Sequence, residues 1–323
     1  MSSRGASAPG GGATSGPASA PGGASGGGAM RFLDPAVLAA ISGLDLVAQT
    51  VVEGFIAGLH RSADFGFSQE FAEYRAYVPG DDLRHVDWNA FARTERLYLK
   101  RWRGETSSVL TVLLDASNSM SFASHAVRKA DYARFLAASL CYLAIRKQRD
   151  AAGLVVFDDE VRDYIRPSTR QGQLFRVLAA LEQAEPRART RLEAPLKHVE
   201  AFVRRRGIIV VLSDFYEPPA AVVRAIEPLR HRGSEVVLFH VLDREELQLE
   251  IGGSSVLVDL ESGARFPVTQ EYAARDYRER ITAHCKELEE RAGAAGLGYR
   301  LLQTSQPLDA ALREYLAVRQ GRD

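Results

Sequence analysis

The chain has 323 residues, of which 46% are hydrophobic and 25% charged, and these proportions are typical of a globular protein with one to three domains. Its 41 basic and 41 acidic residues balance, so the overall charge favours neither nucleic acid nor an anionic membrane surface as a partner. The two cysteines, Cys141 and Cys285, match no metal-binding or redox spacing, and reduced thiols are expected for both.

The chain begins with residues 1–29, which are almost wholly Gly, Ala, Ser and Pro. Such sequence buries too little apolar surface to fold, so a disordered tail is predicted. Asp34 and Pro35 then form a typical helix start, and one helix is expected to run to about Leu59. A polar stripe along this helix argues against a membrane span. Because the first residues also lack the order of a signal peptide, a cytoplasmic protein is expected.

A dense run of aromatic and charged residues follows, from Phe65 to Arg103. Its part from Leu97 to Trp102 alternates like a strand with one wet face. Residues 30–107 are therefore predicted to form a smaller amino-terminal module. The basic and aromatic side chains of residues 91–103 leave a nucleic-acid adaptor open as an alternative, although the balanced net charge disfavours it.

From residue 108 to residue 323 the chain alternates between apolar strands and amphipathic helices. The strands are expected at 109–114, 153–157, 161–165, 207–213, 235–242 and 299–302. The helices are expected at about 125–148, 174–181, 192–205, 218–231, 271–293 and 308–319. A small β excursion is expected at 251–268. This alternation predicts an α/β domain with a doubly wound, mostly parallel sheet.

The strand at 109–114 leads directly into Asp115, Ser117 and Ser119. In extended chain, residues two apart point to the same side, so one carboxylate and two hydroxyls can converge. The strand at 207–213 similarly ends at Asp214. Ligands of such sheets bind beyond the carboxyl ends of the strands. Hard oxygens without His or Cys suit Mg²⁺ or Mn²⁺, so the sequence predicts a metal site at this edge.

Two sets of motifs resemble known families. The stretch from Asp115 to Ser119 resembles the metal-ion-dependent adhesion site of von Willebrand factor A domains. The motifs at 70–75, 78–84 and 86–88 resemble the bacterial family named domain of unknown function 58, which carries an A domain behind an amino-terminal module. The metal ligands that this resemblance implies are Asp115, Ser117, Ser119, Thr190 and Asp214.

The resemblance also implies a function. In A domains the metal keeps one position open, and a Glu or Asp of a partner protein fills it. Members of the family are associated with MoxR-type AAA+ ATPases, which are thought to help other proteins mature. A metal-dependent protein-interaction scaffold is thus expected, and ATP hydrolysis is expected on the partner, because this chain has no Gly-x-x-x-x-Gly-Lys-Ser/Thr loop.

An enzyme is the alternative of a different class. A metal-dependent hydrolase would use Asp115 with a metal-bound water. An aspartate nucleophile of the phosphatase type would be expected to have a second acid at position 117, where this chain has Ser117. A serine nucleophile would lie in Gly-x-Ser-x-Gly, which the motif does not match. Catalysis at this site is therefore not expected.

Overall fold

The computed structural model describes residues 34–61, 71–77, 86, 91–93, 96–102, 108–187, 191–203, 206–230, 233–251, 253, 255–260, 263–269 and 271–321. The predicted tail at residues 1–29 lies outside this part of the chain. So does much of the dense segment between residues 62 and 107. Within the described residues, no helix combines the length and the apolar character that crossing a membrane requires.

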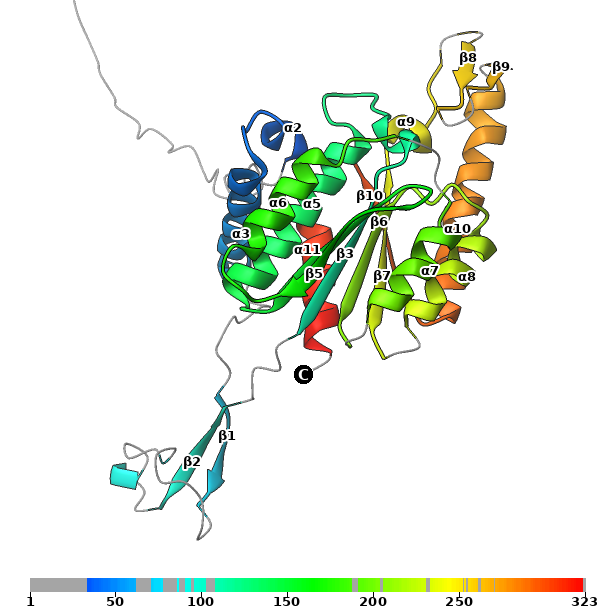
Figure 1. Ribbon diagram of the computed structural model, residues 1–323. Coiled ribbons are helices and arrows are strands. Elements are labelled where there is room, and N and C mark those ends of the chain that lie inside the picture. Colours follow the sequence, from blue (N-terminus) through cyan, green and yellow to red (C-terminus); the bar gives the residue numbers. More distant parts are fainter. Residues whose placement is uncertain are drawn as a thin grey trace, which may run out of the picture.

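A six-stranded sheet forms the centre of the molecule (Figure 1). In spatial order its strands are β10 (Gly298–Gln303), β7 (Glu235–Leu242), β6 (Ile208–Ser213), β3 (Val109–Asp115), β4 (Ala151–Phe157) and β5 (Val161–Ser168). Neighbours are parallel except for β4 and β5, which pair antiparallel at one edge. The chain enters at β3, adds β4 and β5 on one side, and then adds β6, β7 and β10 on the other. The strand order therefore reverses between β3 and β6.

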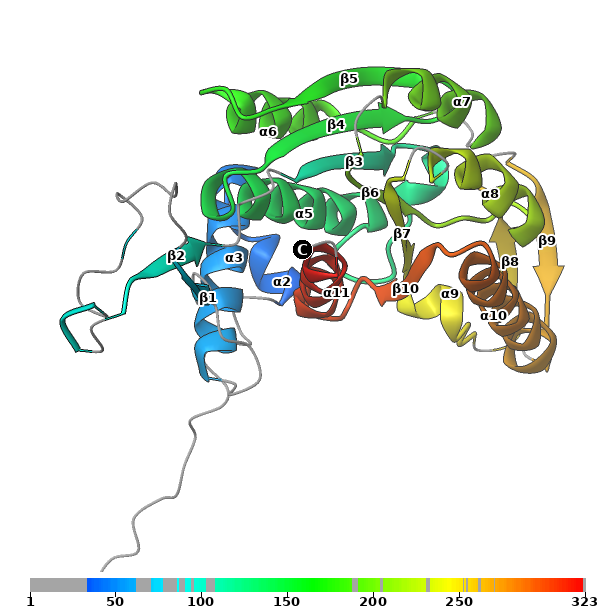
Figure 2. The same ribbon diagram turned by 90° about the horizontal axis from the view of Figure 1, so that it is seen from below.

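Helices cover both faces of the sheet, as the view in Figure 2 shows. The helices of one layer are α3 (Leu44–Arg61), α5 (Lys129–Tyr142), α6 (Gln173–Gln183) and α11 (Asp309–Gln320). Those of the other layer are α7 (Glu193–Phe202), α8 (Pro219–Ile226) and α10 (Arg278–Ala294). β3 serves both layers, because Val112 and Leu114 pack into one core and Leu113 into the other. The doubly wound, mostly parallel α/β fold is confirmed, and it is consistent with a von Willebrand factor A-like domain.

The first helix differs from its prediction. It was expected to be continuous, but α2 (Pro35–Leu38) ends after one turn and α3 begins only at Leu44. The chain between them includes Gly43 at a φ of 89°, a left-handed conformation that interrupts a helix and that glycine adopts readily. Helix α5, which was expected from about residue 125, begins at Lys129.

The position of α3 bears on the predicted division of the chain. α3 packs against α5 and α6. Its buried residues Val51, Phe55 and Leu59 belong to the same core cluster as one face of the sheet. A boundary at residue 107 would separate this helix from its own core. Between α3 and residue 107, the described residues include an antiparallel pair, β1 (Phe71–Ala76) and β2 (Tyr98–Trp102), and a short helical turn at 91–93.

The remaining elements lie at the carboxyl edge of the parallel strands. After β7, the chain forms the short helix α9 (Arg244–Leu247) and then the antiparallel strands β8 (Ser255–Val258) and β9 (Arg265–Val268). Both strands lie within residues 251–268, where a small β excursion was predicted. We call β8, β9 and their connecting turn, residues 255–268, the ribbon. Figure 1 shows it beyond α10, at the same end of the sheet as α9.

Candidate metal and partner-binding site

The first three predicted ligands meet where β3 ends. Asp115 is the last residue of the strand and is only 1% exposed. Its Oδ1 accepts a hydrogen bond from the backbone N–H of Ser117 at 2.9 Å. The chain then turns into a short 3₁₀ helix, and the hydroxyl oxygens of Ser117 and Ser119 lie 3.0 Å apart. The convergence expected from their spacing is present.

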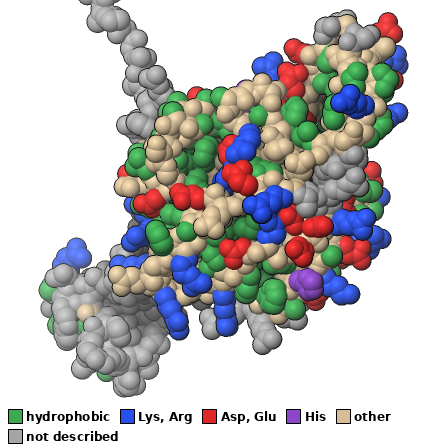
Figure 3. All heavy atoms as spheres, turned by 45° about the horizontal axis from the view of Figure 1, so that its top comes forward, with side chains coloured by type: hydrophobic (Ala, Val, Ile, Leu, Met, Phe, Trp, Pro, Cys, Tyr) green, Lys and Arg blue, Asp and Glu red, His purple; other side chains and the backbone are tan. Residues whose placement is uncertain are grey.

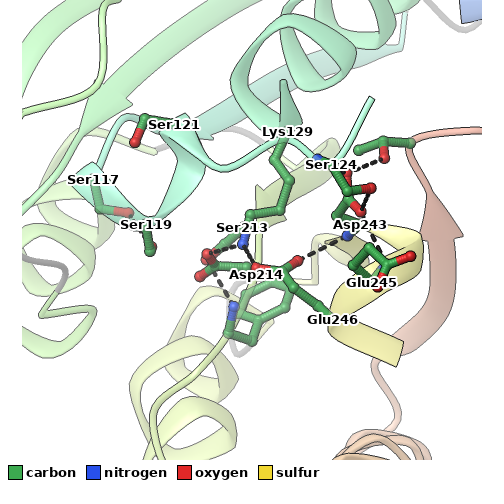
Figure 4. Close-up of polar contacts among 12 residues, drawn as sticks. Ser117, Ser119, Ser121, Ser124, Lys129, Ser213, Asp214, Asp243, Glu245 and Glu246 are labelled. Carbon is green, nitrogen blue, oxygen red and sulfur yellow. Dashed lines mark hydrogen bonds and ion pairs between the residues drawn. The ribbon is translucent and has the colours of Figure 1, made fainter. Parts of the chain in front are cut away.

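β6 brings Asp214 to the same place. Ser213, the last residue of the strand, donates a hydrogen bond from Oγ to Oδ2 of Asp115 at 2.5 Å. Asp214 follows it and is 2% exposed. Figure 4 shows Ser117, Ser119, Ser213 and Asp214 gathered around one point at the sheet edge. This point is the switch between β3 and β6, the usual ligand position in open α/β sheets.

The chemistry of these groups fits a hard divalent cation. Burial, and then the negative charge of Asp214, raise the pKa of the Asp115 carboxyl above its ordinary value. A cation between two buried carboxylates would relieve this cost, because an opposite charge favours the ionised form. Carboxylate and hydroxyl oxygens are also ligands that Mg²⁺ accepts. The described residues include no group of three or more His, Cys, Asp or Glu side chains that could hold a metal.

Thr190, the fifth predicted ligand, lies outside the described residues. The loop that leads to it does pass the site, since the backbone N–H of Arg187 donates to the carbonyl oxygen of Ala116 at 2.8 Å. Residue 187 also forms an isolated bridge with Ser117. The role of Thr190 therefore stays a prediction.

The structure adds a residue that the sequence did not reveal. Lys129, at the start of α5, is fully buried. Its Nζ donates to Oδ2 of Asp214 at 2.8 Å and to Oε1 of Glu246 at 2.6 Å. One ammonium group thus neutralises two carboxylates, one of which is a predicted metal ligand. Figure 4 shows Lys129 directed between them.

Glu246 connects this ion pair to the rest of the edge. Its Oε2 accepts a hydrogen bond from the backbone N–H of Asp243 at 2.8 Å. The Asp243 side chain in turn accepts one from the backbone N–H of Glu245. Asp243 and Glu246 together form a capping box at the start of α9. Asp243 also accepts hydrogen bonds from Ser124 and from Thr304, which follows β10. A continuous polar network therefore holds together the loop after β3, helix α9 and the end of β10.

After Asp214 the chain turns so that an aromatic side chain lies next to the ammonium group of Lys129. Phe215 has a φ of 43°, which is uncommon for a bulky residue, and its ring is buried in the core. The turn brings the ring of Tyr216 to 4.8 Å from Lys129 Nζ, a distance typical of a cation–π contact. Tyr216 remains 44% exposed. The ring of Tyr216 thus lies over the buried ammonium and is partly accessible to solvent.

One signal in the sequence could have pointed to Lys129. The chain has only five lysines, and this one adjoins the apolar stripe of a helix that begins shortly after Ser119. A lysine at a buried helical position needs a carboxylate partner. The sequence does not say which acid supplies it, since Asp214 is 85 residues away and Glu246 is 117 residues away.

The family model described as "Protein of unknown function DUF58" matches residues 73–291, which include Asp115, Asp214 and Lys129. The chain belongs to the DUF58 family. Uncharacterized proteins of Mycobacterium tuberculosis and Mycobacterium bovis are 28% identical to it over 291 residues, covering 88% of this chain and 90% of each relative.

Solved structures give more distant matches to this DUF58 chain. The conserved hypothetical protein BatB from Bacteroides thetaiotaomicron is 15% identical with a TM-score of 0.47, and the match covers 67% of this chain and 100% of that one. An aerotolerance-related membrane protein from Bacteroides fragilis is 17% identical with a TM-score of 0.45, covering 64% of this chain and 97% of that one.

Proposed function

We propose that this DUF58 protein is a scaffold that binds a partner protein through a metal ion. Mg²⁺ or Mn²⁺ would be held by Asp115, Ser117, Ser119 and Asp214, with Thr190 as the predicted fifth ligand. The metal would accept a carboxylate from the partner. The main support is the convergence of two buried carboxylates and two hydroxyls at the strand switch point.

The contacts of Asp115 do not suit a nucleophile. Both of its oxygens accept hydrogen bonds, Oδ1 from the Ser117 N–H and Oδ2 from the Ser213 hydroxyl. A nucleophilic carboxylate needs a free oxygen directed at the substrate, whereas a carboxylate held on both sides orients a metal or its water. These contacts argue against Asp115 as a nucleophile. We propose that the chain itself is not an enzyme.

The proposed partner is a MoxR-type AAA+ ATPase, met in the bacterial cytoplasm. ATP hydrolysis would take place on that partner, and this chain would connect it to a protein undergoing maturation. The motif resemblance described above supports this assignment. A carboxylate on the surface of the ATPase, or of the maturing protein, would complete the coordination of the metal.

Binding between the purified DUF58 chain and a MoxR-type ATPase from the same genome tests the proposal. Binding is expected with Mg²⁺ and should weaken by at least about tenfold in EDTA or with Asp115→Ala, a loss of about 1.4 kcal/mol. Asp163→Ala, a change at an exposed acid on β5, should leave binding unchanged. Equal affinity in EDTA would exclude a metal-dependent interaction.

Direct metal binding provides a second measurement that needs no partner. Mn²⁺ should bind the full chain with a defined stoichiometry. The decrease in the electron paramagnetic resonance signal of the free ion measures this binding. Asp115→Ala should remove this binding while the circular dichroism spectrum stays that of the native chain. Unchanged Mn²⁺ binding in this variant would place the metal elsewhere.

A further inference from the structure

A cavity of about 690 Å³ lies at the end of the sheet opposite the candidate metal site. Its lining includes Val109 and Ala151, the first residues of β3 and β4, whereas Asp115 is the last residue of β3. At about 3.3 Å per residue, roughly 20 Å of strand separates the two places. Pockets for small molecules commonly measure about 300–1,000 Å³. The cavity is thus of a size that suits a small ligand, and it is separate from the metal site.

A bulge in β5 shapes one wall of the cavity. Three consecutive residues, Arg166, Pro167 and Ser168, line it, although a regular strand directs only alternate residues to one side. The pairing of β4 with β5 shifts register across Gly153, where a Cβ atom would lie 2.6 Å from Cδ of Pro167. Glycine therefore leaves the room that Pro167 occupies. Bulges re-aim side chains and are common beside functional sites, and this one brings Arg166 to the cavity.

The charge of the lining is positive. Arg166 lies near the end of β5, Arg170 in the loop that follows, and Arg176 in the first turn of α6. Of the described residues that line the cavity, none is Asp or Glu. The three guanidinium groups form no ion pair with a carboxylate of the described part of the chain. Over much of the face shown in Figure 3, by contrast, acidic and basic side chains lie close together. A group of arginines without acids favours an anionic ligand.

Hydroxyl and aromatic groups complete the lining. The Oγ of Ser168 accepts a hydrogen bond from the backbone N–H of Arg170 at 3.1 Å, which leaves the hydroxyl proton available to donate. The rings of Tyr164 and Phe202, which also line the cavity, stack with their centroids 4.9 Å apart and an interplanar angle of 16°. Phe202 remains 44% exposed. Part of its surface is therefore accessible to a planar ring of a ligand.

We propose that this cavity binds a small organic phosphate that carries a planar ring, the chemical class to which nucleotides belong. The arginines would hold the phosphates, because the guanidinium fork forms paired hydrogen bonds with phosphate oxygens. The ring would pack against Phe202. A small molecule fits better than a nucleic acid, since the cavity is of small-molecule size and the 41 basic residues of the chain are balanced by 41 acidic ones. The proposal needs neither the metal nor a partner protein.

Calorimetric titration of the full chain with ADP, inorganic pyrophosphate and adenosine tests this proposal. The titrations are made in EDTA, so that phosphates cannot bind through a metal ion. ADP is expected to bind more tightly than pyrophosphate, which lacks the ring, and than adenosine, which lacks the phosphates. Arg166→Gln with Arg170→Gln should lower the affinity for ADP about tenfold or more, because it removes two charge-assisted contacts. Phe202→Ser should lower the affinity for ADP and leave that for pyrophosphate unchanged.

Arg224→Gln with Arg278→Gln is the matched control, because it removes the same charge from two exposed arginines, on α8 and α10, that do not line the cavity. It should leave the affinity for ADP unchanged. All arginine variants should keep the circular dichroism spectrum and the Mn²⁺ binding of the natural chain. Asp115→Ala should instead remove Mn²⁺ binding and leave ADP binding in EDTA intact. The cavity and the metal site thus have separate signatures.

The proposal would be overturned by a lack of ADP binding to the natural chain at about 1 mM, or by equal losses of affinity in the cavity variant and the control variant. Equal affinities for ADP and pyrophosphate would also contradict it, because the ring would then make no contact. Tighter binding of an oligouridylate than of ADP, lost in the cavity variant, would make the occupant a nucleic acid, contrary to the proposal. None of these results bears on metal-dependent partner binding, so the two proposals fail separately.

Discussion

Replacing Lys129 with methionine should lower the free energy of unfolding by about 3–5 kcal/mol, because it leaves two buried carboxylates without their shared cation. The lysine side chain is fully buried, and its partners Asp214 and Glu246 are 2% and 11% exposed in their side chains. Methionine is unbranched and of similar length, so the change removes the charge without opening a large cavity. Urea denaturation followed by circular dichroism measures the loss.

Two further variants make this expectation specific. Lys286 is also paired with a glutamate, Glu290, but its side chain is 73% exposed, so Lys286→Met should change stability by no more than about 0.5 kcal/mol. Glu246→Gln in the Lys129→Met background should recover part of the loss, because it removes one of the unpaired charges. Equal effects of the two lysine substitutions would show that the buried ammonium does not stabilise the fold.

The sequence predicted the fold because burial leaves a local pattern. A strand between two helical layers is apolar at nearly every position, and β3 has this pattern from Val109 to Leu114. The proximity of Asp115, Ser117 and Ser119 followed from local spacing. That of Asp214 required only the rule that parallel strands end at one edge. These expectations needed no knowledge of long-range contacts.

The contacts that the sequence missed are those set by the tertiary structure alone. Lys129 meets an acid from β6 and another from α9, and no spacing in the chain encodes either distance. The hydrogen bond between Asn118 and the turn of the ribbon spans 142 residues. The polar stripe of the first helix likewise showed that one face would be buried, but not which core would bury it.

The burial of α3 in the same core as the sheet leads to a second large prediction. Leu59→Ala, near the end of α3, should lower the free energy of unfolding by about 2–5 kcal/mol, the usual cost of truncating a buried leucine. Leu59 is fully buried in the core cluster that includes Val112 and Leu114 of β3. Because the helix and the sheet share this core, urea should unfold the variant in one transition with a lower midpoint.

Leu46→Ala is the matched control, since it makes the same change on the same helix at a side chain that is 53% exposed. It should cost no more than about 0.5 kcal/mol, because surface substitutions away from special contacts rarely cost more. The difference between the two variants then measures packing rather than helix propensity. If Leu59→Ala instead left the main transition unchanged and added a separate early one, α3 would belong to an independent amino-terminal module, and the boundary first predicted at residue 107 would hold.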